Sequence, residues 1–178
     1  MNPFLPSRAL PLLTLCAIAI QGFHVSGQEE ENPPFEPLEK LVFVDAHFDE
    51  VGGVDGLDGT YDMVISPDGE FLYVASMNDD AIAVFDRDPA TGELSFISRS
   101  KNGEGGIDGL NGARSLDVSP DGEFLYVVSM FDDALVTFSR NIATGSLTFL
   151  GRVKDGETGV DGLDGARSIC ISPDGLNL

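Results

Sequence analysis

The sequence predicts an all-β protein built from a repeated four-stranded unit, and two observations support this. The stretch GARSLDVSPDGEFLYVVSM at 112–130 has a close copy 53 residues earlier, at 59–77, and a third copy begins 53 residues later, at Gly165. Each copy contains short runs of β-branched and aromatic residues separated by turn residues, which favours strands and leaves little room for helix. A four-stranded unit at this period is typical of one blade of a β-propeller, whose repeats run about 40–50 residues.

Four antiparallel strands are expected in each unit. The turn Ser-Pro-Asp-Gly follows the first strand, and it predicts a tight hairpin because proline presets φ, aspartate bonds the turn backbone and glycine accepts positive φ. The first strand of each unit is expected at 61–65, 114–118 and 167–171, and the second at 71–75 and 124–128. The third is expected at 81–85 and 134–138, and the fourth near 94–98 and 147–151.

The repeats occupy residues 41–178 and predict an incomplete propeller. Complete units run over 41–93 and 94–146, and a third starts at residue 147, so fewer than three blades are present. Propellers have about 4–8 blades. We therefore expect either that the chain is a fragment of a longer one or that several chains assemble into one ring.

Residues 1–27 are predicted to be a signal peptide. Arg8 gives a positive start, residues 9–20 are apolar, and Val25 and Gly27 are small residues before a cleavage point. This apolar run is shorter than the roughly 20 residues of a membrane span, and a retained anchor is the alternative. Residues 28–40 are predicted to be an acidic, proline-rich linker. The protein is thus expected to be secreted, periplasmic or on the cell surface, without a membrane span once the signal is removed.

The net charge and the cysteine content limit the kinds of partner and cross-link that are expected. The formal net charge of −20 excludes nucleic acid and anionic membranes as favourable partners and would attract cations or basic proteins. Solubility alone would also account for this charge. Of the two cysteines, Cys16 lies in the predicted leader, so no internal disulfide is expected in the mature chain, and Cys170 is expected to be a small buried apolar residue.

The motif at 112–129 and its copies resemble the lactonase-type seven-bladed propeller family, which includes phosphogluconolactonase-like and carboxymuconate-cyclase-like proteins. The resemblance covers residues 41–178. A frequent form of the family motif is Gly-Pro-Arg-His at the start of the innermost strand, where the arginine and histidine can face the central channel and are linked to lactone binding. The resemblance therefore implies that Arg114 and Arg167 are candidate ligand-binding residues.

This chain departs from the family motif at the histidine. Ser115 and Ser168 stand at that position, and the first copy departs further, with Tyr61 and Asp62. Lactone hydrolysis needs a general acid or base with a pKa near the working pH, which serine lacks, so other blades would have to supply it. A structural ion pair with neighbouring aspartates is the alternative role for Arg114 and Arg167.

Two sets of acidic loops are expected to open on one face of the propeller, before each first strand and after each second strand. Oxygen-rich loops suit calcium, which takes about 6–8 oxygen ligands, although aspartate and glycine also simply make turns. The spacing is not that of an EF-hand. The candidate metal ligands are Asp55, Asp58, Asp108, Asp161, Asp164, Asp79, Asp80, Asp132 and Asp133.

Three functions remain open at this point. The first is a secreted binding or scaffold propeller for a small molecule or a protein. The second is a lactone hydrolase that uses channel arginines, so enzymatic activity is left open. The third is a calcium-dependent adhesion module, with calcium as the candidate cofactor.

Overall fold

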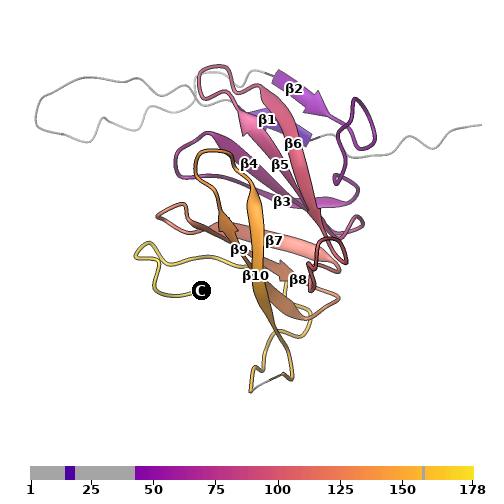
Figure 1. The fold of residues 1–178 in the computed structure, drawn as a ribbon, viewed down its shortest axis with the longest axis vertical. Coiled ribbons are helices and arrows are strands. Elements are labelled where there is room, and N and C mark those ends of the chain that lie inside the picture. The colour runs from indigo at the N-terminus through magenta and orange to yellow at the C-terminus, as the bar shows by residue number, and fades with distance from the viewer. Residues whose placement is uncertain (1–14, 19–42, 158) are drawn as a thin grey trace, which may run out of the picture.

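The computed structural model describes residues 15–18, 43–157 and 159–178, and two four-stranded antiparallel sheets form its centre (Figure 1). Blade 1 has the order β3-β4-β5-β6, and blade 2 has the order β7-β8-β9-β10. In blade 1 the strands are β3 (Thr60–Ile65), β4 (Phe71–Ser76), β5 (Ala81–Arg87) and β6 (Leu94–Lys101). In blade 2 they are β7 (Ala113–Val118), β8 (Phe124–Ser129), β9 (Ala134–Arg140) and β10 (Leu147–Lys154). The predicted all-β fold and the four-stranded blades are confirmed, and the described part of the chain contains no helix that could cross a membrane.

The Ser-Pro-Asp-Gly turns adopt the predicted hairpin geometry. Gly69 N donates to Ser66 O at 2.8 Å, and Ser66 Oγ donates to Asp68 Oδ1 at 2.5 Å. The fourth residue of the turn, Gly69, has a φ of 78°, in the region that glycine tolerates without strain. The turn after β7 repeats these contacts, so the same four residues fix both hairpins.

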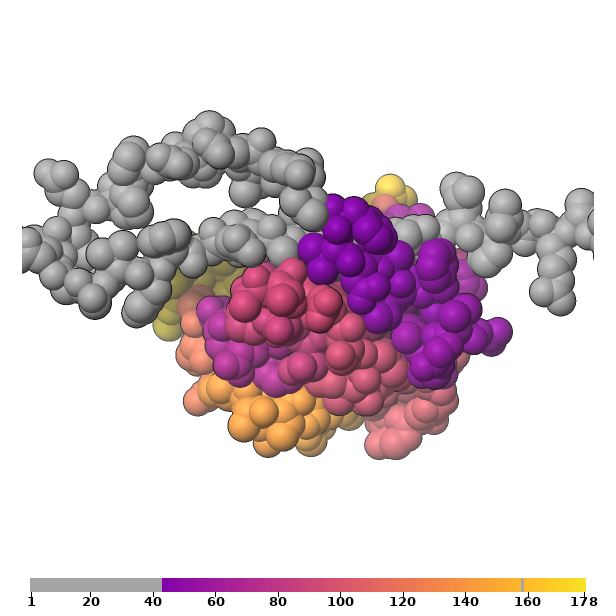
Figure 2. Space-filling view, turned by 90° about the horizontal axis from the view of Figure 1, so that it is seen from above, coloured from indigo at the N-terminus to yellow at the C-terminus, as the bar shows by residue number. Residues whose placement is uncertain are grey.

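A small sheet of β1 (Leu15–Ile18) and β2 (Phe43–His47) precedes blade 1. Phe43 stands one repeat before Phe96 in the sequence. Phe43 pairs with Ile18 of β1, and in the same way Phe96 pairs with Phe85 of β5. In both pairs the register shifts next to the phenylalanine. Strand β2 is therefore equivalent to the fourth strand of a blade, and β1 occupies the third-strand place. Figure 2 shows the residues after Phe43 (indigo) lying against blade 1 and away from blade 2 (orange).

The predicted signal peptide and linker stay predictions. Only Leu15–Ile18 of the predicted signal peptide falls in the described residues, where it forms β1, and the linker at 28–40 lies outside them. His47 of β2 is partly buried, and its ring lies 5.2 Å from that of Phe85.

The main core lies between the two blades. Strands β3 and β4 of blade 1 contact β7 of blade 2, and apolar side chains from both sheets fill the space between them. The buried members are Phe71, Tyr73, Ala75, Ile82, Val84, Leu110, Ala113, Leu116, Val118, Leu125, Val127, Val136 and Phe138. A second, smaller cluster covers the opposite face of blade 1, where Val54 and Leu57 of the preceding loop pack on Phe85.

The guanidinium of Arg140 joins the blades through polar contacts. Its side chain is fully buried, and it donates from Nη2 to Asp68 Oδ2 at 2.6 Å and from Nε to the Tyr73 hydroxyl at 2.7 Å. The Tyr73 hydroxyl in turn donates to Gly145 O at 2.9 Å, and burial raises the pKa of Tyr73. Two blade 1 residues thus satisfy a buried cation of blade 2, which an apolar environment would otherwise destabilise.

The innermost strands are joined by side-chain acceptors. Asp62 Oδ2 accepts hydrogen bonds from Ser115 Oγ at 2.7 Å and from Leu116 N at 3.2 Å. One unit later, Asp117 Oδ2 accepts from Ile171 N at 2.8 Å. Strands β3 and β7 belong to different sheets and share no backbone ladder, so the Asp62 carboxylate bridges them.

The predicted strand at 167–171 is wrong. The segment lies against β7 through the Ile171 contact, but it has no strand assignment because no other described strand pairs with it. The expectation that Cys170 is buried is also wrong, since its side chain is exposed. Among the described residues no strand pairs with this segment and no sheet covers Cys170, which accounts for the two differences respectively.

We predict that Asp68→Asn lowers the free energy of unfolding by about 1–2 kcal/mol, because Arg140 then loses its charged partner while remaining buried. Asparagine keeps the oxygen that caps the turn. The matched control is Asp121→Asn, which changes the same turn position in blade 2, where no arginine is bonded to the carboxylate in the described residues. Urea unfolding of both variants measures the difference, and equal losses would contradict the role of Arg140.

The ion pair between Arg140 and Asp68 also predicts how the stability of the fold depends on pH. Burial acts to raise the pKa of Asp68, but hydrogen bonds from Ser66, the Glu70 amide and Arg140 outweigh it and hold this pKa below its ordinary value. A carboxylate with a lowered pKa stabilises the fold above its unfolded pKa, and this stability is lost as pH falls through the folded pKa. The stability gap between wild type and Asp68→Asn should therefore be constant from about pH 5 to 7 and shrink below about pH 4.

We predict that Ser129→Ala raises stability by about 1 kcal/mol, because the Ser129 hydroxyl is fully buried without a hydrogen-bond partner in the structure as described. The equivalent Ser76 hydroxyl lies 3.4 Å from that of Thr60, whereas blade 2 has Ala113 in place of the threonine. Ser76→Ala is the control and should not stabilise. Thermal unfolding followed by circular dichroism tests both, and a destabilised Ser129→Ala variant would refute the assignment.

Candidate functional site

Tyr61, Arg114 and Arg167 occupy the same position in three successive units: near the start of β3, near the start of β7, and in the segment after Gly165 that has no strand assignment. The guanidinium carbon of Arg114 lies 4.3 Å from the centroid of the Tyr61 ring, and Nη1 lies 3.9 Å from Met130 Sδ. Arg167 is exposed. Within the described residues neither arginine forms an ion pair, so the proposed structural ion pair with loop aspartates is not seen. Arg114 therefore offers a charged group that is oriented by an aromatic ring but not neutralised.

Asp79 and Asp132 hold the loop that precedes the first strand of their own blade. Asp79 Oδ2 accepts from Asp58 N at 2.8 Å, and Asp132 Oδ2 accepts from Asn111 N at 2.9 Å. Each carboxylate also lies near a lysine of the outermost strand, with N–O distances of 3.4 Å and 3.5 Å. These two candidate metal ligands thus have a structural role in both blades.

Asp80 and Asp133 connect one blade to the loop of the next. Both have positive φ, 54° and 50°, which aspartate adopts more readily than most residues. Their side chains accept from Gly112 N at 2.7 Å and from Gly165 N at 2.8 Å. The repeated geometry shows that this aspartate fixes the spacing between successive units.

Asp55 and Asp108 form ion pairs with arginines of outer strands. Arg99 Nε lies 2.6 Å from Asp55 Oδ2, and Arg152 Nε lies 2.7 Å from Asp108 Oδ2. The hydrogen bond from Arg152 lowers the pKa of Asp108. The equivalent Asp161, together with Asp164, is exposed, and Asp58 Oδ1 accepts from Asn78 Nδ2 at 3.2 Å.

The structure brings together three carboxylates, of which the sequence analysis named Asp55 and Asp79 but not Asp49. One oxygen each of Asp49, Asp55 and Asp79 lies within 4.8 Å of the others. Asp49 also caps the loop, accepting from Leu57 N at 3.0 Å, and Asn102 does the same for Leu110 N at 3.1 Å one unit later. A neutral amide performs this capping equally well, so the cap itself needs no cation. Alignment of the units at a period of 53 would have identified position 49 as part of this loop.

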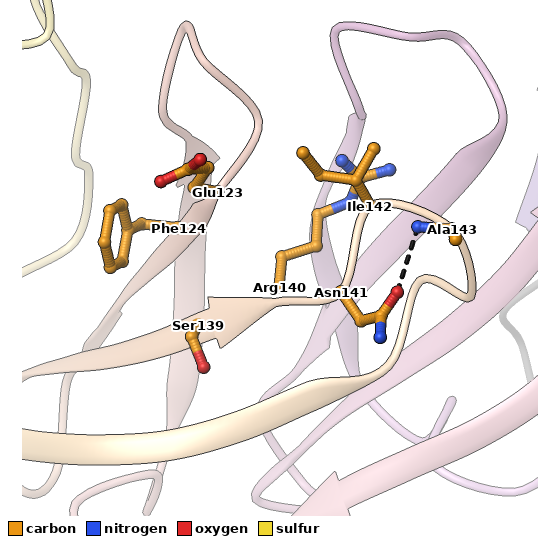
Figure 3. Close-up of a pocket in the computed structure, with 7 residues that line it drawn as sticks. All are labelled: Glu123, Phe124, Ser139, Arg140, Asn141, Ile142 and Ala143. Carbon is orange, nitrogen blue, oxygen red and sulfur yellow. Dashed lines mark hydrogen bonds between the residues drawn. The ribbon is translucent and has the colours of Figure 1, made fainter.

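A hollow of about 490 Å³ lies at one end of blade 2 (Figure 3). Phe124 and the turn Asn141–Ala143 line it, and Phe124 points away from Arg140. In blade 1 the equivalent Phe71 is buried, because Gly145 of blade 2 packs against its ring so closely that an added Cβ would overlap it. The hollow therefore corresponds to a blade-packing position and not to a ligand pocket.

The sequence profile of the family described as "Lactonase, 7-bladed beta-propeller" matches residues 24–171. The chain is 35% identical over 89 residues to a 6-phosphogluconolactonase of Formosa agariphila, and 37% identical over 86 residues to a 6-phosphogluconolactonase of Bacillus subtilis. Each alignment covers 48% of this chain and 23% of the relative, so the chain spans about a quarter of the length of these relatives.

A solved structure extends this similarity to the fold. The structure of the periplasmic gluconolactonase PpgL of Pseudomonas aeruginosa superposes with a TM-score of 0.55 at 30% sequence identity, and the match covers 68% of this chain and 32% of that one. The matched profile covers most of the chain, and the blades described above have the sheet order that this fold requires. The chain belongs to the seven-bladed β-propeller lactonase family.

Proposed function

We propose that this chain is part of a propeller that binds a sugar lactone in its central channel and hydrolyses it. The observation that carries the proposal is Arg114, whose guanidinium is stacked on Tyr61 and free of any carboxylate among the described residues. An arginine that is oriented but not neutralised can bind an anionic or carbonyl oxygen of a ligand. The relatives named 6-phosphogluconolactonase and gluconolactonase support a sugar lactone as the substrate class.

Hydrolysis of a lactone requires more than an arginine. A general base removes a proton from water as the water oxygen bonds to the carbonyl carbon, and the ring C–O bond then breaks with a proton transferred to the leaving oxygen. Arg114 can stabilise the negative charge on the carbonyl oxygen, as charged donors do at developing oxyanions. The Asp62 carboxylate already accepts hydrogen bonds from Met63 N, Ser115 Oγ and Leu116 N, which argues against Asp62 as the general base. We assign the base to blades beyond those described.

Residues at this channel position determine the ligand in this proposal. The change from histidine to Ser115 removes a proton-transfer group but leaves a hydroxyl, which here donates to Asp62. The same propeller could therefore bind a lactone or its product acid without turning it over, which is the binding or scaffold role inferred from the sequence. A periplasmic or secreted location agrees with the predicted signal peptide and with the periplasmic relative.

We predict that Arg114→Ala weakens binding of 6-phosphogluconate about tenfold or more, because one charged hydrogen bond to an anion is worth about 1.5–3 kcal/mol. Isothermal titration calorimetry with 6-phosphogluconate and with gluconate measures the effect, and lactone hydrolysis corrected for the spontaneous rate reports turnover. Arg99→Ala is the control, since Arg99 is already paired with Asp55 and Glu104. Equal binding by wild type and Arg114→Ala would remove the basis of the proposal.

Calcium binding is a second candidate, favoured by the proximity of Asp49, Asp55 and Asp79. If a calcium ion binds there, added calcium raises the melting temperature by mass action and a chelator reverses the effect. Asp49→Asn reproduces the residue that blade 2 carries at Asn102, so it should keep the loop cap and abolish the calcium effect. A melting temperature that is the same in calcium and in chelator would reject both the site and the adhesion role.

A further inference from the structure

Arg114 is the extra residue of a β-bulge in blade 2. Its neighbours Ala113 and Ser115 pair with consecutive residues of β8, so Arg114 itself has no partner residue on that strand. Tyr61 is the extra residue of the same bulge in blade 1. A bulge turns a side chain away from the regular alternation of the strand, and bulges are frequent beside active sites. The repeated bulge therefore gives this position of each unit its own direction.

The ring of Phe131 lies beside this bulge. Phe131 N donates to Asn111 O at 3.2 Å, and the ring packs on Gly112 so closely that an added Cβ there would overlap it. Gly112 is two residues before Arg114, so their Cα atoms are at most about 7 Å apart. Met130, the residue before Phe131, has its sulfur 3.9 Å from Arg114 Nη1. Phe131 and Arg114 therefore lie at the same end of blade 2.

Phe131 is 55% exposed, and this exposure is a property of its place in the unit. The equivalent residue of blade 1, Asn78, is also exposed, although the neighbouring blade 2 is present beside it. Beside Phe131 the loop of the next unit is likewise in place, because Asp133 Oδ1 accepts a hydrogen bond from Gly165 N at 2.8 Å. A neighbouring blade thus leaves this position accessible to a ligand.

The loop does not need a phenylalanine for its own structure. In blade 1 Asn78 Nδ2 donates to Asp58 Oδ1 at 3.2 Å, whereas blade 2 has Phe131 and Asn111 at these two positions. In both blades the aspartate that follows holds the loop, by accepting the backbone amide of residue 58 or 111. A single exposed aromatic ring is ordinary on a protein surface. This ring, however, lies beside an arginine without a carboxylate partner in the described structure, and small-molecule sites combine aromatic walls with a few polar groups.

We propose that Phe131 determines the specificity of the Arg114 site, by packing its ring against the C–H face of a cyclic sugar lactone while Arg114 binds an oxygen of the ligand. This inference rests on the proposed function, which supplies the ligand class. The face of an aromatic ring carries partial negative charge and attracts the C–H groups that a sugar ring presents. The open-chain acid formed by hydrolysis must lose torsional freedom to make the same contact. Phe131 therefore favours the cyclic substrate over the open-chain product.

Titration calorimetry on the full-length protein with two probes tests this specificity. Gluconolactam is a cyclic analogue that resists hydrolysis, and gluconate is the open-chain acid. Phe131→Asn places the blade 1 residue in the blade 2 loop, and it should weaken gluconolactam binding about three- to tenfold, the range of one aromatic contact. Gluconate binding should change less than about twofold, because the flexible acid gains little from the ring. Phe131→Tyr keeps the ring and should bind both probes like wild type.

Phe48→Asn is the matched control, because Phe48 is also exposed but directly follows β2 and is not in the blade that carries Arg114. This variant should bind both probes like wild type, and circular dichroism checks that every variant is folded. Equal weakening of both probes in Phe131→Asn would overturn the role in specificity. If Arg114→Ala loses both probes while Phe131→Asn changes neither, the role of Phe131 fails and the proposed function stands. A wild-type protein that binds neither probe would overturn both.

Discussion

The ion pair between Arg140 and Asp68 is the contact on which the relation of the two blades depends. Apolar packing would allow the sheets to slide, because leucine, valine and phenylalanine side chains impose little direction. A buried guanidinium tolerates only arrangements in which Asp68 and the Tyr73 hydroxyl stay within hydrogen-bond distance. Since Tyr73 also donates to Gly145, the pair fixes the turn of blade 2 against β4. The polar contact thus specifies which of the possible apolar packings is adopted.

The acidic composition follows in part from this architecture. Asp62, Asp80 and Asp133 each accept a backbone amide of the neighbouring unit, and Asp79 and Asp132 hold the loops of their own blades. Each new unit adds the same acceptors, so the negative charge of the chain grows with the number of units. Many of the carboxylates that suggested cation binding are therefore part of the framework, and Arg114 stands apart from them as a cation without a carboxylate partner in the described structure.

The repeat made much of the fold predictable from sequence. A period of 53 residues and the turn Ser-Pro-Asp-Gly placed β3, β4, β7 and β8 within about two residues of their observed bounds, because turn chemistry is local. The segment at 167–171 was mispredicted because strand formation also needs a pairing partner, which is not a local property. The roles of Asp80 and Asp108 could not be predicted for a similar reason. The sequence pattern places both in acidic loops, but only the structure shows that one bonds the next blade and the other an outer-strand arginine.

Amide hydrogen exchange at Leu116 and Gly112 tests the central claim, that side-chain carboxylates of one blade hold the backbone of the next. Neither amide has its carboxylate acceptor in its own blade, since Leu116 N donates to Asp62 and Gly112 N donates to Asp80. The account predicts that both exchange as slowly as the central amides of β8, as residues opened only by unfolding do. Rapid exchange at these two amides in a protein whose β8 amides are protected would contradict it.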